Sequence, residues 1–370
     1  MSFYIILTGI LFMTTVIGIV SMPISINKIG NVGLNLKQVN NSRICKCIAL
    51  IILMFLWTIT AFRGLEIGND TQTYINYFYN ISENGVNSNY EIELGYQYFC
   101  LLISKINKNP HVFLFLISTI LYIGVGIYIF KYSKNILFSV CLFFSLCFSA
   151  FTNTLRQNIA MILCLYAFQS IKSKKYIKTI LIVGIASCFH YSAWIFLLFF
   201  LDKIIPKKRL LVFTASLIIS FFGILGVLNY ILIFLLPEYS IYFLSEYASS
   251  GWIAVSYQVV RNGIFYYFVY GMYRDKIQDN KFILDNFVLL LLCSSLGFVV
   301  NLFTRASEYF LLIGVVELPN AFFEGKVKNK QIIIILLCFI MLLYFLVTLI
   351  WRPEWNNLYP YKFFWNTSTN

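Results

Sequence analysis

The chain has 370 residues, of which 60% are hydrophobic and only 12% are charged. Soluble domains carry about 25% charged residues, so a soluble fold could not bury this much apolar surface, and lipid must be the solvent. The net charge of +13 does not indicate a nucleic-acid partner, because the lysines lie in short loops between apolar runs, where the positive-inside rule places them.

Apolar runs of about 17–25 residues can cross a bilayer as helices. The candidates, in chain order, are 2–22, 46–62, 111–130, 135–151, 154–171, 210–234, 256–273, 283–302, 306–324 and 331–350. When the lysine-rich loops are placed in the cytoplasm, both termini lie outside. The sequence therefore predicts an all-α polytopic membrane protein with about 10–12 transmembrane helices.

The stretch 177–206 is apolar but has basic residues at both ends. Both ends should therefore lie in the cytoplasm, which favours a re-entrant hairpin that turns near His190. Broken helices are tolerated at membrane depth where protein surrounds them. A single long span is the alternative, and it would disturb the alternation of the other loops.

Residues 63–110 are expected to form one long external loop. Within it, 94–109 is amphipathic and is expected to lie as a helix in the outer membrane interface. No Pro/Ser-rich linker, low-complexity tract or internal repeat divides the chain. We therefore expect a single integral membrane domain over 1–370.

Arginine, in contrast to lysine, occurs at the expected outer ends of the spans, at Arg63, Arg156, Arg261 and Arg305. A guanidinium at such a boundary is costly unless it is paired or faces water, so each is a functional candidate. Its fork of donors suits phosphate and diphosphate. Snorkelling to the interface, or pairing with nearby acids, is the structural alternative.

The acidic candidates lie in the external loop, where Asp70, Glu91 and Glu93 could act as a general base or contact sugar hydroxyls. Tyr74 follows Asp70 at helical spacing and could form part of a carbohydrate groove or of the interfacial aromatic belt. His190 lies between two apolar stretches, where leaving its imidazole without a hydrogen-bond partner would cost free energy. It could be a general base, a donor to a phosphate, or a packing residue.

No metal or cofactor motif is present in the sequence. The nine cysteines lie mostly inside apolar runs, and the one close pair, at positions 45 and 47, does not have CxxC spacing. The chain has no HExxH, P-loop or nucleophile-elbow pattern. We expect no cofactor.

Several motifs, in their order and spacing, give a family resemblance. FRGLEIGNDTQTYINYF, YEIELGYQYFCLLI, TLRQNIAMILCLYAF, KKYIKTILIVGIASCFHYSAWIFL, TRASEYFLL and PYKFFW follow one another along most of the chain. The chain thereby resembles the Wzy-type repeat-unit polymerases of O-antigen and capsule synthesis, in particular the EpsG-like branch. The residues that fill the motif positions are Arg63, Gly68, Asp70, Tyr74, Leu155, Arg156, Gln157, Phe189, His190, Arg305 and Tyr309.

The resemblance implies a GT-C-like architecture and a metal-independent glycosyltransferase in the bacterial cytoplasmic membrane. Such an enzyme polymerises undecaprenyl-diphosphate-linked oligosaccharide units at the outer face, for lipopolysaccharide or capsule, and often works with a chain-length regulator. On this reading the four arginines bind the diphosphate, and His190, Asp70 or Glu93 takes the acceptor proton. Tyr74, Glu91 and Tyr309 are the expected sugar contacts.

Other functions also fit a polytopic chain of this kind. An O-antigen ligase or another GT-C glycosyltransferase usually carries a larger external loop. A flippase or transporter of lipid-linked oligosaccharide should show internal repeats and polar residues near the bilayer midplane. An acyltransferase acting on surface sugars would also fit a chain with one key histidine. The external polar residues and the absence of a repeat favour the polymerase.

Overall fold

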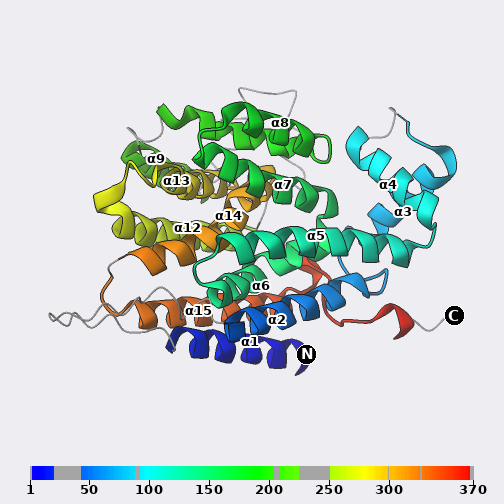
Figure 1. The fold of residues 1–370 in the computed structure, drawn as a ribbon, viewed down its shortest axis with the longest axis horizontal. Coiled ribbons are helices and arrows are strands. Elements are labelled where there is room, and N and C mark those ends of the chain that lie inside the picture. Colours follow the sequence, from blue (N-terminus) through cyan, green and yellow to red (C-terminus); the bar gives the residue numbers. More distant parts are fainter. Residues whose placement is uncertain are drawn as a thin grey trace. The chain divides into compact units, whose positions relative to one another are not determined.

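The structure is a computed structural model of the chain, and it describes residues 2–20, 43–87, 92–203, 209–224, 251–298, 300–325 and 327–366. Figure 1 shows that these residues are built almost wholly of helices, and the one β-type contact among them is an isolated bridge between Arg63 and Phe363. The predicted all-α polytopic class is confirmed. The helices cluster into two compact units, and a single domain over 1–370 stays a prediction.

Unit 1 comprises Met1–Ile162, Cys188–Tyr191 and Val327–Asn370. Its helices are α1 (Ser2–Val20), α2 (Arg43–Ala61), α3 (Thr71–Asn84), α4 (Leu94–Ile106), α5 (Pro110–Tyr132), α6 (Ile136–Asn153), α15 (Lys330–Trp351) and the start of α7 (Leu155–Lys172). Helix α6 packs against α1, α2, α5 and α15. In Figure 1, α15 lies beside α1 although the two are at opposite ends of the sequence.

Unit 2 comprises Leu163–Ser187 and Ser192–Lys326. It holds most of α7, then α8 (Tyr176–Ser187), most of the 3-10 segment η1 (Tyr191–Lys203), α9 (Arg209–Ile224), α12 (Trp252–Tyr273), the 3-10 turn η4 (Arg274–Lys276), α13 (Lys281–Leu296) and α14 (Leu302–Glu324). Helix α13 packs against α9, α12 and α14 and is buried along its whole length. It is therefore the core of this unit.

Among the residues that the structure describes, five helices are long and apolar enough to cross a membrane, namely α2, α5, α6, α14 and α15, and shorter apolar helices lie at Phe3–Gly18, Tyr176–Ser187 and Tyr191–Leu201. A multi-pass membrane protein fits this pattern, while the count of about 10–12 spans and the GT-C-like architecture stay predictions. Among the helix boundaries that differ from expectation, those of α12 and α14 change the positions of predicted arginines. Helix α12 begins at Trp252, so Arg261 lies more than two turns inside it, and α14 includes Arg305.

The helix is broken near His190, where the hairpin is expected to turn, and its re-entry into the membrane stays a prediction. Helix α8 ends at Ser187, and helical geometry resumes at Tyr191. The rings of Tyr176 and Phe200, at opposite ends of the stretch, lie 5.9 Å apart, so the two arms run back along each other. The turn, Cys188–Tyr191, belongs to unit 1. The two arms on either side of it belong to unit 2.

Candidate functional site

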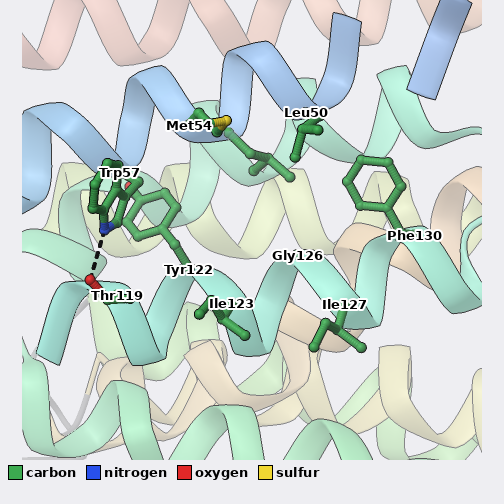
Figure 2. Close-up of a pocket in the computed structure, with 10 residues that line it drawn as sticks. Leu50, Met54, Trp57, Thr119, Tyr122, Ile123, Gly126, Ile127 and Phe130 are labelled. Carbon is green, nitrogen blue, oxygen red and sulfur yellow. Dashed lines mark hydrogen bonds between the residues drawn. The ribbon is translucent and has the colours of Figure 1, made fainter. Parts of the chain in front are cut away.

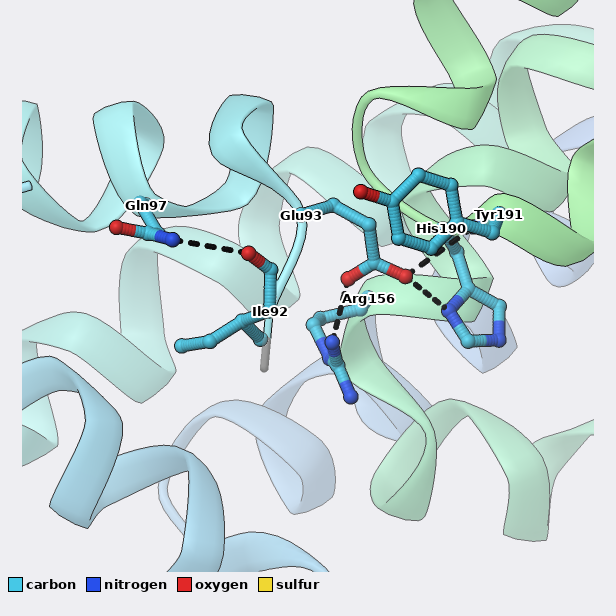
Figure 3. A network of polar contacts seen from close by, with 6 residues as sticks. All are labelled: Ile92, Glu93, Gln97, Arg156, His190 and Tyr191. Atoms are coloured by element: carbon cyan, nitrogen blue, oxygen red, sulfur yellow. Dashed lines mark hydrogen bonds and ion pairs between the residues drawn. The ribbon is translucent and has the colours of Figure 1, made fainter. Parts of the chain in front are cut away.

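Glu93 is the centre of a polar cluster in unit 1, which we call the Glu93 cluster (Figure 3). Glu93 is 3% exposed and is the N-cap residue of α4, although its side chain makes no capping hydrogen bond. One oxygen, Oε1, is 2.9 Å from His190 Nδ1 and accepts a hydrogen bond of 3.1 Å from the backbone N–H of Tyr191. The other oxygen pairs with the guanidinium of Arg156.

Local structure explains how residues so distant in sequence meet. Helix α6 ends at Asn153 and α7 begins two residues later, so Arg156 lies in the first turn of α7. Asn158 Nδ2 donates to the carbonyl oxygen of Ala150 at 2.7 Å and ties the two helices across the break. Gln97 Nε2 donates to the carbonyl of Ile92 at 2.9 Å, which fixes the segment that carries Glu93.

A glycine allows α4 to approach the turn that carries His190. A Cβ atom at Gly95 would lie 2.6 Å from the carbonyl oxygen of Cys188 and 2.8 Å from its Cβ. Contacts this short cannot be relieved by rotating a flexible side chain, because one partner is backbone. Any larger residue at this position must therefore separate α4 from the turn.

Replacing Gly95 with Ala should destabilise the protein by about 1–3 kcal/mol, the usual cost of overpacking. The control is Gly184→Ala in α8, where an added Cβ meets nothing within 4 Å and Ala is the better helix former. Thermal unfolding of the two variants in detergent measures the difference. Equal unfolding temperatures would show that α4 and the turn do not pack as described.

The charge of Glu93 is stabilised strongly by its neighbours. Burial alone would raise the pKa of this carboxyl, but the hydrogen bond from His190, the charge of Arg156 and the N–H of Tyr191 outweigh it and lower the pKa from 4.5 to about 2. Glu93 is therefore ionised at physiological pH. An ionised carboxylate can only accept hydrogen bonds, so Nδ1 of His190 must carry the hydrogen that it donates to Glu93. In the neutral imidazole ring the free lone pair is then on Nε2.

Glu93→Gln should cost about 3 kcal/mol of stability, because it leaves Arg156 without its counter-ion. A depressed pKa means that the stabilisation is fully present above the unfolded-state value of 4.5 and is lost as pH falls through about 2. The difference in unfolding temperature between wild type and variant should therefore persist down to pH 4.5. A difference that disappears between pH 7 and pH 5 would contradict the lowered pKa.

The Arg156 guanidinium is also held by aromatic rings. Its central carbon lies 5.9 Å from the ring centroids of Tyr74 and of Tyr96, which contact each other edge to face at 6.0 Å. Cation–π contacts of this kind orient the planar group. The side chains of Arg156 and His190 keep 19% and 22% of their surface exposed, so a ligand can reach both.

The other predicted residues of the external loop lie elsewhere in unit 1. Arg63 is completely buried, and its Nη1 donates to the carbonyl of Thr60 and, at 3.5 Å, to Ser118 Oγ. Within the described ranges, its Nε and Nη2 have no hydrogen-bond partner. Asp70 is half-buried at the N-cap of α3 without a side-chain capping bond. Glu91 lies outside the described residues.

Unit 2 holds the remaining predicted residues. Arg261 is buried, donates from Nε to Asn262 Oδ1 at 3.0 Å and lies over the ring of Tyr257. Arg305 is exposed, and Glu308 is within electrostatic reach of both arginines. Tyr309 is buried, with its hydroxyl 3.0 Å from Ser192 Oγ. Binding of diphosphate by the two arginines, and of sugar by Tyr309, stays a prediction.

An apolar cavity of about 440 Å³ lies between α2 and α5 in unit 1 (Figure 2). Its lining is almost entirely hydrocarbon, from Leu50, Leu53, Met54, Trp57, Thr119, Tyr122, Ile123, Gly126, Ile127 and Phe130. The polar atoms at its wall are paired with each other or with neighbours. Trp57 Nε1 donates to Thr119 Oγ1 at 3.0 Å, and the Tyr122 hydroxyl is 3.0 Å from Thr60 Oγ1. The cavity suits a hydrocarbon chain.

The sequence indicates His190 and Glu93 as alternative proton acceptors and Arg156 as a diphosphate ligand, and the structure brings these three together. The sequence did not indicate Tyr96, Gln97 or Gly95. In the part of the chain that the structure describes, no three His, Cys, Asp or Glu side chains are grouped so that they could hold a metal ion.

The sequence model of a protein family, the EpsG family, matches residues 46–363 of the chain. No curated protein and no solved structure matches the chain.

Proposed function

Because the chain belongs to the EpsG family, we propose that it polymerises oligosaccharide repeat units carried on undecaprenyl diphosphate, at the outer face of the bacterial cytoplasmic membrane. The product would be an O-antigen or a capsular polysaccharide. Family membership and the apolar helices make it a multi-pass membrane protein of polysaccharide biosynthesis. The substrate, the reaction and the side of the membrane are the proposal.

The observation that carries the proposal is an imidazole oriented by a buried carboxylate beside a partly exposed guanidinium. Glu93 fixes the Nδ1–H tautomer of His190, so that Nε2 can accept a proton from a hydroxyl group. Arg156 offers further N–H donors in a fixed plane, which match the oxygens of a diphosphate. Glycosyl transfer from a lipid diphosphate needs both a proton acceptor and a stabiliser of the leaving group.

In the proposed step, a hydroxyl oxygen of the incoming unit forms a bond to the anomeric carbon of the growing glycan. The bond from that carbon to the diphosphate oxygen breaks, and undecaprenyl diphosphate leaves with the electron pair. His190 Nε2 takes the hydroxyl proton, and Arg156 stabilises the charge that develops on the leaving group. Glu93, with a pKa of about 2, is too weak a base for this proton and acts as a positioning residue.

The cavity between α2 and α5 supports a lipid-linked substrate. It is lined by hydrocarbon and lies between two helices that are long and apolar enough to span a membrane. None of its lining residues belongs to the Glu93 cluster, so we assign it only to the hydrocarbon part of the carrier. A chain-length regulator remains a proposed partner.

Cells that lack this protein test the proposal against its alternatives. Loss of a polymerase should leave single repeat units on the lipid carrier, accessible to periodate added outside intact spheroplasts. Loss of a flippase would leave units protected on the cytoplasmic side. Loss of a ligase would leave long polymers on the carrier, and either of these last two results would overturn the proposal.

A further inference from the structure

The segment that follows α15 packs against the chain near the end of α2. Residues 353–364, which we call the strap, begin with the 3-10 turn η5 (Pro353–Trp355) and end where the 3-10 turn η6 (Phe364–Asn366) begins. The strap pairs with the chain just after α2. Gly64 N donates to the carbonyl of Lys362 at 2.9 Å, and Phe364 N donates to the carbonyl of Phe62 at 3.0 Å.

Three asparagine side chains fasten the strap to the loop 63–70. Asn69 Nδ2 donates to the carbonyls of Glu354 and Trp355 at 3.0 and 2.8 Å. Asn357 Nδ2 donates to the carbonyl of Glu66 at 2.6 Å. Asn153 contacts both sides, because its Oδ1 accepts from Asn69 N at 2.5 Å and its Nδ2 donates to the carbonyl of Asn356 at 3.2 Å.

The loop also contacts the strap through the backbone of Gly68. Gly68 adopts a φ of +92°, and a Cβ there would lie 2.9 Å from the carbonyl oxygen of Thr152. Its N–H donates to the carbonyl of Asn357 at 3.1 Å. Only glycine adopts this geometry without strain. Gly68 therefore allows the loop to lie in direct contact with both α6 and the strap.

The loop leads directly into α3, and α3 carries Tyr74, which contacts Arg156 of the Glu93 cluster. Thr71 N and Oγ1 donate to the carbonyls of Gly68 and Ile67, which begins the helix. One turn later, the Tyr74 ring lies 5.9 Å from the guanidinium carbon of Arg156. A continuous set of contacts therefore joins the strap to Arg156.

We propose that the strap is a positioning element for the reaction, acting through the loop 63–70 and Tyr74 on the Arg156 guanidinium. Nothing in the chemistry of the Glu93 cluster requires a C-terminal segment, so this role is separate from that of His190 and Arg156. The effect of the strap on polymerisation rests on the proposed function. Its effect on the arrangement of Arg156 does not.

The test uses the full chain with Asn69→Asp and Asn357→Gly combined. Aspartate cannot donate to the two strap carbonyls. Glycine removes the second amide without strain, because Asn357 already has a positive φ of 46°. The matched control is Gln72→Glu, which makes the same change of amide to acid at an exposed position on α3. Deuterium exchange of residues 63–71 and phenylglyoxal modification of Arg156 are both followed by mass spectrometry.

We expect faster exchange of residues 63–71 and faster modification of Arg156 in the strap variant only. Polymerisation should fall by about 10- to 100-fold, the effect of a small misplacement of a catalytic group. In an Arg156→Lys background the strap variant should add little further loss, because contributions that act through one residue are not additive.

Unchanged exchange and unchanged Arg156 modification would overturn the proposal, and so would the same fold loss of polymerisation in both backgrounds. If wild-type protein forms no polymer, the proposed function fails. Exchange and modification then still decide whether the strap positions Arg156.

Discussion

Arg156→Ala should abolish measurable polymerisation, with a rate loss of at least about 10²–10³-fold, which is the usual effect of removing one donor that stabilises developing charge. The physical reason is that the leaving diphosphate loses a planar, permanently charged group that tyrosine rings hold in place. Arg156→Lys keeps the charge but loses the fork of donors, and should recover only part of the rate. Sizing of lipid-linked glycans in membranes is the measurement.

Arg156 also neutralises buried Glu93, so a loss of activity could reflect misfolding. The variant that combines Arg156→Ala with Glu93→Gln separates the two effects, because it removes both charges of the pair. It should regain thermal stability and remain inactive. Recovery of polymerisation in this variant would show that Arg156 serves only to balance Glu93. Arg274→Ala, which removes an exposed arginine of η4 in unit 2, is the control and should change little.

His190→Asn should reduce polymerisation by about 10²–10⁴-fold, the range attributed to general-base catalysis. The asparagine amide can still donate toward Glu93 Oε1, where His190 Nδ1 now lies at 2.9 Å, but it offers no basic nitrogen to the acceptor hydroxyl. The variant should therefore fold and insert as wild type does. Initial rates with purified protein measure the loss.

Added imidazole gives a second test of the role of His190. In His190→Ala, the space left by the ring beside Glu93 should admit imidazole and restore part of the rate. A role as a packing residue would give the opposite pattern, with His190→Asn fully active or with destabilised protein that imidazole does not rescue. Since 22% of the side chain is exposed, the added base can reach the site.

Some of this arrangement can be predicted from sequence, because a charged or polar side chain next to an apolar run is costly without a partner. That rule selects Arg156 and His190 one at a time. It does not reveal that Glu93 joins them, since Glu93 is 63 positions from Arg156 and 97 positions from His190 along the chain. The break near His190 is predictable for a similar reason, because basic residues flank the apolar stretch on both sides.

The contacts that hold the site have no clear sequence signal. Gly95 is important for the close approach of α4 to Cys188, which depends on a distant backbone atom. The strap binds the loop 63–70 through backbone carbonyls, and any residue type supplies a carbonyl. Helix α12 begins at Trp252 and not at residue 256, because residues 252–255 are apolar and continue the helix back to its N-cap, Gly251.

The most direct test of the central claim is polymer formation by purified protein in proteoliposomes supplied only with undecaprenyl-diphosphate-linked repeat units. Wild type should produce a ladder of lipid-linked glycans, while His190→Asn and the variant that combines Arg156→Ala with Glu93→Gln should leave single units although both remain folded. A ladder of equal length from either variant would contradict the assignment of the Glu93 cluster as the catalytic site, and single units with wild type would contradict the polymerase itself.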